Sequence, residues 1–128
     1  MRSVPRTLAL LALLGALTGA CGEGRPTVAE WEQQWDRVVG LLPDLSSLKP
    51  PDEALCQTTL ASLRTESDSL IPPPDPTIDD TVNQWIETAE ATFFNCPPTG
   101  EIDGFADAYD VLFRLQGEIE TVLEIDRG

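Results

Sequence analysis

The sequence predicts an all-α domain, a small four-helix up-down bundle that spans residues 27–126. Three observations favour this fold class. Apolar residues recur every three or four positions in four separate segments, which is the period of an amphipathic helix. Proline-rich stretches separate the segments, and helix-capping patterns precede some of them. Because short connections favour antiparallel neighbours, we expect the four helices to pack in up-down-up-down order.

The first helix is predicted to begin at Thr27, which stands three residues before Glu30 in a capping-box pattern. Pro43 ends it. Its apolar stripe consists of Val28, Trp31, Trp35, Val38 and Leu42. Tryptophans one turn apart on such a stripe are expected to lie in the core. The alternative is an exposed platform on which a sugar or an apolar ligand stacks.

The second helix is predicted to begin at the proline-led, acid-rich stretch 50–53. Its inner side is expected to carry Leu55, Cys56, Leu60, Leu63 and Leu70. Its end stays open, because residues 65–69 are poor helix formers. The prolines at 72–74 and 76 cannot continue it.

The third helix is predicted to be capped by Thr77, with Asp80 at the third helical position, and to end near Cys96 before two prolines. Its inward residues are Ile78, Val82, Trp85, Ile86, Ala89 and Phe93. The fourth helix is predicted from about Asp103 to Ile125. Its seam consists of Phe105, Ala108, Leu112, Leu115, Ile119 and Val122, widened by Tyr109, Phe113 and Leu123.

The first 21 residues have a different character. Two arginines are followed by an apolar stretch over 8–17 and by the small residues Thr18, Gly19 and Ala20, which lead directly to Cys21. The run 17–21 resembles the lipobox of bacterial lipoprotein precursors, of the small secreted kind found in high-GC Gram-positive bacteria. The resemblance implies that residues 1–20 are a signal peptide that is removed, and that Cys21 receives a diacylglyceryl group.

The same resemblance implies a location at the outer face of the cytoplasmic membrane, with residues 21–26 as a lipid-anchored tether. At about 3.3–3.6 Å per residue, this tether reaches no more than about 20 Å. Two alternatives are an uncleaved anchor and a secretory peptide cut without lipidation. The apolar stretch, about 10–14 residues, is shorter than the roughly 20 that span a bilayer as a helix.

The cysteines divide between two tasks. If Cys21 carries lipid, Cys56 and Cys96 have only each other as partners, in a compartment that permits disulfides. Such a bond joins the second and third helices, and an antiparallel hairpin brings the two positions together. The alternatives are a free buried pair and a redox dithiol, although no C-x-x-C motif is present.

The mature chain is strongly acidic. Removal of residues 1–20 takes away two arginines and no acid, which leaves 6 basic and 22 acidic residues and a net charge of −16. A field of that sign repels nucleic acid, so we expect no nucleic-acid partner. The charge serves solubility, or it attracts a cationic partner or divalent cations.

A candidate contact face lies at the chain's end, where negative charge destabilises a helix C-terminus. It consists of Glu118, Glu120, Glu124 and Asp126. The face is expected to be a solvated terminus, or else a surface that meets a basic partner or cations.

The sequence offers no catalytic set. It contains no histidine, which removes the imidazole base and most zinc and haem ligation. We therefore expect no cofactor and no enzymatic activity, and interpret the protein as a non-catalytic interaction or accessory module of the cell envelope. The alternative is a helical bundle that binds a small ligand or a divalent cation. A hydrolase would need two carboxylates that converge in a cleft.

Overall fold

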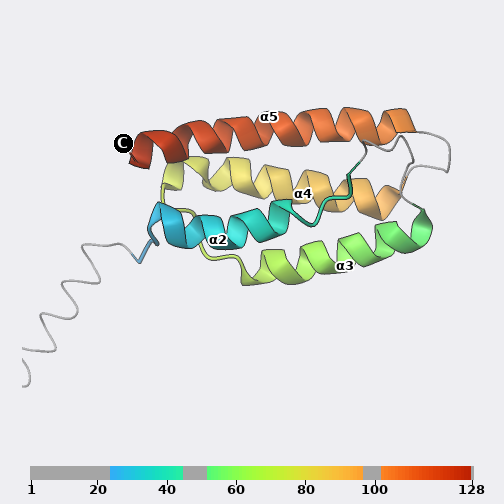
Figure 1. Cartoon of the computed structure of the whole chain (residues 1–128), viewed down its shortest axis with the longest axis horizontal. Helices are drawn as coiled ribbons and strands as arrows, with labels where there is room; N and C mark the ends of the chain where they lie inside the picture. Colours follow the sequence, from blue (N-terminus) through green and yellow to red (C-terminus); the bar gives the residue numbers. More distant parts are fainter. Residues whose placement is uncertain (1–23, 45–51, 97–101, 128) are drawn as a thin grey trace, which may run out of the picture.

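The computed structural model describes residues 24–44, 52–96 and 102–127 (Figure 1). Within these ranges every regular element is a helix, and the elements are α2 (Val28–Val39), α3 (Glu53–Ser69), the 3-10 helix η1 (Pro76–Ile78), α4 (Asp79–Asn95) and α5 (Ile102–Arg127). The expected signal peptide, Cys21 and the first three residues of the tether lie outside the described residues.

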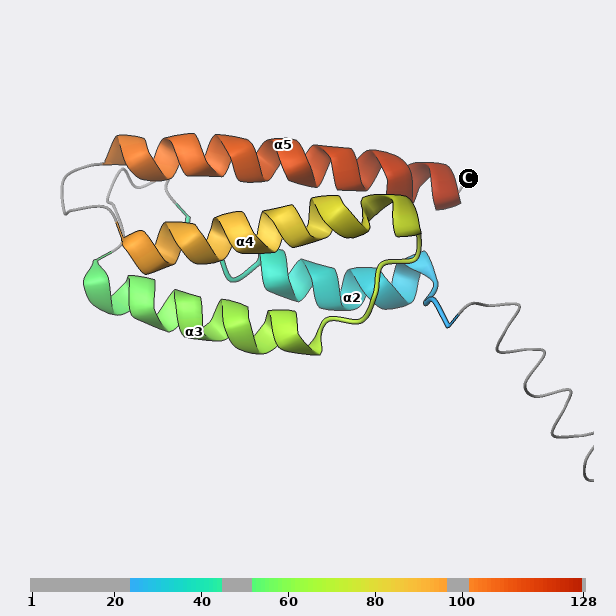
Figure 2. The same cartoon turned by 180° about the vertical axis from the view of Figure 1, so that it is seen from behind.

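The four long helices run in alternating directions, so the predicted up-down-up-down bundle is confirmed (Figures 1 and 2). α4 packs against both α3 and α5, and α2 packs against the same two helices from the other side. The chain enters α2 at the end of the bundle where α5 finishes. We call this the tether end, marked by Arg25 and Arg127, and we call the opposite end, marked by Pro43 and Cys96, the far end.

Capping side chains begin the first two helices. The hydroxyl of Thr27 accepts the backbone N–H of Glu30 at 3.2 Å, and the carboxylate of Glu30 accepts the backbone N–H of Thr27 at 3.4 Å. The predicted capping box is therefore confirmed. Asp52 caps α3 by accepting the N–H of Leu55 at 2.8 Å.

The open question about the second helix is settled, because α3 continues to Ser69. Two hydroxyls in its polar last turns bond back along the helix. Thr65 donates to the carbonyl of Ala61 at 3.0 Å, and Ser69 donates to the carbonyl of Thr65 at 3.2 Å.

The predicted cap at Thr77 is wrong. Thr77 lies inside η1, and the capping residue there is Asp75, whose carboxylate accepts both the backbone N–H of Thr77 at 2.9 Å and its hydroxyl at 2.7 Å. A carboxylate two residues upstream therefore takes the donors of Thr77, and Pro76 sets the backbone for a tight turn. α4 then begins at Asp79 with no side-chain cap.

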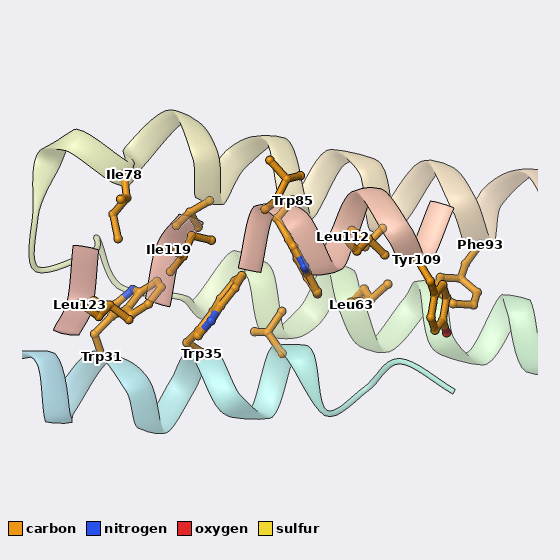
Figure 3. Close-up of a cluster of buried hydrophobic side chains, with 14 of the residues drawn as sticks. Trp31, Trp35, Leu63, Ile78, Trp85, Phe93, Tyr109, Leu112, Ile119 and Leu123 are labelled. Carbon is orange, nitrogen blue, oxygen red and sulfur yellow. The ribbon is translucent and has the colours of Figure 1, made fainter. Parts of the chain in front are cut away.

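The three tryptophans form the centre of the core (Figure 3). Trp31 and Trp35 stack with ring centroids 5.1 Å apart, and Trp35 meets the edge of Trp85 at 4.9 Å. All three side chains are at most 2% exposed, which confirms the core interpretation, so the tryptophans form no exposed platform. The indole N–H of Trp85 donates to Gln116 at 3.1 Å, so its polar atom is satisfied inside the bundle.

Two residues assigned to the inner faces are exposed. Leu55 is 43% exposed and Phe113 is 57% exposed. Leu55 lies in the first turn of α3, where no further turn covers it. Phe113 follows the fully buried Leu112 and lies past the edge of the arc that faces the neighbouring helices. Helical spacing predicts which side of a helix is apolar, but the partners decide how wide an arc they cover.

The disulfide between Cys56 and Cys96 joins α3 to the residue that follows α4, with the Cα atoms 5.9 Å apart. This confirms the predicted pairing and the antiparallel hairpin. Cys96 adopts a left-handed backbone conformation, with φ at 35°, at the position that ends α4. Glycine is the usual residue in that conformation, so cysteine stands here at a steric cost because the bond requires it.

Candidate functional site

The C-terminal acids predicted as one contact face divide among three places. Glu120 and Glu124 lie toward α2, near Glu32 and Asp36, and Arg127 lies among them. Glu118 instead forms an i, i+4 ion pair with Arg114 at 3.7 Å.

Asp126 lies toward η1, where it shares a hydrogen bond with Asp75. Desolvation, followed by the charge of Asp75, raises the pKa of Asp126. The hydrogen bonds from Thr77 instead lower the pKa of Asp75.

Arg127 provides the positive charge of the α2–α5 cluster. Its guanidinium forms an ion pair with Glu32 and a longer one of 3.9 Å with Glu124. Burial, and then the nearby charge of Glu32, raises the pKa of Glu120, and Arg127 partly offsets this effect. The sequence interpretation missed Glu32 and Arg127, because their meeting depends on how α2 packs on α5.

The cluster gives no support to a metal centre. No group of three acidic or cysteine side chains in the described ranges is arranged to hold a metal ion. A guanidinium already provides positive charge among the carboxylates.

Arg25 ties the N-terminal segment to the tether end. Its guanidinium donates two hydrogen bonds to the carboxylate of Asp79, at 3.0 and 3.1 Å, and a third to the carbonyl of Pro73 at 3.0 Å. Such a two-pronged pair fixes orientation as well as distance. We call this arrangement the Arg25 clamp.

The segment that follows α3 contains Pro73, whose carbonyl accepts the hydrogen bond from Arg25. Residues of α2 hold this segment as well. The indole N–H of Trp31 donates to the carbonyl of Ile71 at 3.0 Å, and Gln34 accepts the N–H of Ile71 at 3.0 Å. Within this connection the side chain of Pro73 is buried. Five side-chain hydrogen bonds from residues far apart in sequence therefore define the tether end.

A hollow of about 440 Å³ opens at the far end, between the end of α2 and the first turns of α5. We call it the far-end groove. Its lining residues are Val39, Leu42, Pro43, Asp44, Ala106, Tyr109, Asp110 and Phe113. The exposed ring of Phe113 meets Tyr109 edge-on, with centroids 5.9 Å apart.

Tyr109 joins the two walls of the far-end groove. Its hydroxyl donates to the carbonyl of Pro43 at 2.7 Å, and the side chain is 6% exposed. Burial, and then the charge of Asp44, raises the pKa of Tyr109 to about 12. The phenol therefore stays neutral and bonded under ordinary conditions. One feature of the sequence could have indicated the groove. Tyr109 and Phe113 stand four residues apart on α5, next to the apolar seam and not within it.

No helix in the described part of the chain combines the length and the apolar character needed to cross a bilayer. Comparison with protein-family models, with curated proteins and with solved structures finds no match.

Proposed function

We propose that this protein is a lipoprotein held at the outer face of the cytoplasmic membrane, where it acts as a non-catalytic interaction module of the cell envelope. The lipid would be attached to Cys21 after removal of residues 1–20. The run 17–21 supports this proposal, because small residues before a cysteine are what lipoprotein signal peptidase reads.

The observation that carries the proposal furthest is the Arg25 clamp. Arg25 stands four residues after Cys21, a distance of at most about 14 Å in a fully extended chain. The clamp fixes Arg25 on Asp79 and Pro73, so a lipid on Cys21 would hold the tether end against the headgroups. Lipid attachment would then orient the bundle as well as localise it.

The charge of the tether end is consistent with this arrangement. Glu124 and Asp126 are exposed there, and Asp75 lies beside Asp126. Acidic residues repel anionic lipid, so the bundle would stand on its tether without spreading across the surface. Two acyl chains supply the stable attachment, since one chain alone gives only marginal binding.

Membrane fractionation tests the anchor. The full-length chain, expressed in a high-GC Gram-positive host, is expected in the membrane fraction, and the Cys21→Ser variant is expected to lose membrane attachment. A double variant, Cys56→Ser with Cys96→Ser, serves as the matched control and should remain in the membrane fraction. Equal membrane recovery of the Cys21→Ser chain would contradict the proposal.

Crosslinking on intact cells tests the interaction role. Because the mature chain carries a net charge of −16, partner capture through its surface should weaken as salt rises. Capture that is indifferent to salt would count against an acidic contact surface.

A second candidate function, binding of a small apolar molecule, is favoured by one observation, the volume and lining of the far-end groove. A thermal-shift titration with a hydrophobic dye, with calcium in a parallel arm, tests it. A raised melting temperature that is lost in Phe113→Gln would support this candidate. An unchanged melting temperature in both arms would remove it and the cation alternative.

A further inference from the structure

We propose that the far-end groove binds a short basic and apolar segment of an envelope protein, which inserts an aromatic or branched aliphatic side chain next to an arginine or lysine. The orientation of this surface toward the envelope rests on the proposed lipid anchor. The binding chemistry itself rests only on the residues that line the groove.

The floor of the groove supplies the apolar contact. Six of the eight described residues that line it are aliphatic, aromatic or proline. Phe113 is 57% exposed, yet it packs edge-on against the buried Tyr109. An exposed ring that is held in place by a buried one offers contact area at a low cost in side-chain entropy.

The walls of the groove are fixed before any partner arrives. The hydrogen bond from Tyr109 to the carbonyl of Pro43 ties the end of α2 to α5 across the groove. A preformed surface loses little conformational freedom on binding, so more of the contact energy appears as affinity.

The rim of the groove selects the charge of the partner. Among the described residues that line it, the carboxylates are those of Asp44 and Asp110, and none of these described residues is basic. Arg114, the basic residue one turn after Asp110, pairs with Glu118 instead. A cation beside the inserted apolar group would therefore meet the carboxylate of Asp110, within a chain that already repels acidic partners.

The position of the groove makes it accessible on an anchored protein. Asp110 lies seventeen residues before Arg127 on α5, or about 25 Å at the helical rise of about 1.5 Å per residue. The groove is lined by the end of α2 and the first turns of α5, and both lie away from the end of the bundle where α2 begins and α5 finishes (Figure 1).

Fluorescence anisotropy with a labelled synthetic peptide tests the proposal. The probe is a short peptide that alternates lysine with leucine and phenylalanine, and it is titrated with the full-length Cys21→Ser chain. Two companion peptides replace every lysine by glutamate, or every apolar residue by serine. The lysine-containing apolar peptide is expected to bind, and both companions are expected to bind at least about tenfold more weakly, because each lacks one half of the recognition.

Four variants locate the binding. Phe113→Gln is expected to weaken binding about tenfold, as for a central aromatic contact, and Asp110→Asn about threefold, with a smaller salt dependence. Their controls are Phe94→Gln and Asp107→Asn. Both alter exposed residues outside the groove, so both should leave binding unchanged. Far-ultraviolet circular dichroism checks that all four remain folded.

Four results would overturn the proposal. Equal binding by the glutamate peptide, or equal effects of Phe94→Gln and Phe113→Gln, would show a non-specific surface. Sedimentation could instead reveal a dimer of the chain that Phe113→Gln abolishes. The occupant of the groove would then be a second copy of the chain. If the peptide bound only to the double variant Leu45→Ser with Leu48→Ser, the natural occupant of the groove would be the chain's own residues. Because the test chain carries no lipid, none of these outcomes depends on the anchor.

Discussion

The guanidinium of Arg25 meets the carboxylate of Asp79 through two parallel hydrogen bonds across a sequence separation of 54 residues. Both side chains are only partly buried, at 24% and 40% exposure. The pair joins the segment that follows Cys21 to the first turn of α4. It therefore connects the proposed attachment point of the chain directly to the folded body.

Asp79→Asn should lower the free energy of unfolding by about 0.5–1 kcal/mol, since a partly exposed ion pair is screened by solvent. Asp80→Asn is the matched control, because it removes a charge from the same first turn of α4 without touching Arg25. Urea denaturation at low and high salt measures both. A larger loss for Asp80→Asn would show that the helix dipole, and not the clamp, dominates.

The Cys56–Cys96 disulfide closes a loop of 40 residues, for which the chain-entropy model gives about 4 kcal/mol. Replacing both cysteines by alanine should lower the free energy of unfolding by this amount, which urea denaturation measures as a lower midpoint. The Cys21→Ser variant is the control, with an unchanged midpoint. If the double variant were as stable as the parent, the bond would have no role in holding α3 to α4.

Tyr109 is the chain's one tyrosine, so its ionisation is observed without overlap. Its pKa is raised to about 12 in the folded protein, above the ordinary value of 10.0. Between these values the unfolded chain loses the phenolic proton and the folded chain keeps it. The unfolded state then binds fewer protons, so the free energy of unfolding should fall as pH rises from 10 to 12.

Ultraviolet absorbance of the tyrosinate, followed against pH, measures the Tyr109 ionisation directly. Tyr109→Phe should remove this part of the pH dependence and should also lose the hydrogen bond to Pro43. A tyrosinate signal centred on the ordinary pKa in folded protein would show that the hydroxyl is not buried as described.

Glu120→Gln should raise the free energy of unfolding by some tenths of a kcal/mol, because it removes a partly desolvated charge that lies near Glu32 and Asp36. For the same reason the folded protein holds the Glu120 proton more tightly than the unfolded chain. Acidification through this raised pKa should therefore favour the folded state. Glu118→Gln is the control and should be neutral or slightly destabilising, since Glu118 pairs with Arg114.

Local patterns predicted most of the fold. The Thr27–Glu30 capping box, the proline-bounded segments and the pairing of Cys56 with Cys96 are each confirmed, because each depends on neighbours in sequence or on the cysteine count. The prediction at Thr77 is wrong because two capping patterns overlap there. Asp75, followed by Pro76, is the residue that caps the helical turn. Leu55 and Phe113 were misplaced because spacing gives the direction of an apolar face and not the extent of its cover.

The candidate sites were harder to predict. The Arg25 clamp joins positions 54 residues apart, and no local pattern connects them. Arg127 and Glu32 meet only because α2 packs on α5, and the far-end groove forms where the shorter α2 ends beside a longer helix. Such features depend on helix lengths and packing together, which a single sequence does not specify position by position.

Intact mass spectrometry of the protein, extracted from host membranes without reduction, tests the central claim most directly. A chain that begins at Cys21, carries a diacylglyceryl group and takes up no thiol alkylating reagent at Cys56 or Cys96 is the predicted result. An unmodified Cys21, or alkylated thiols at the other two positions, would contradict the account.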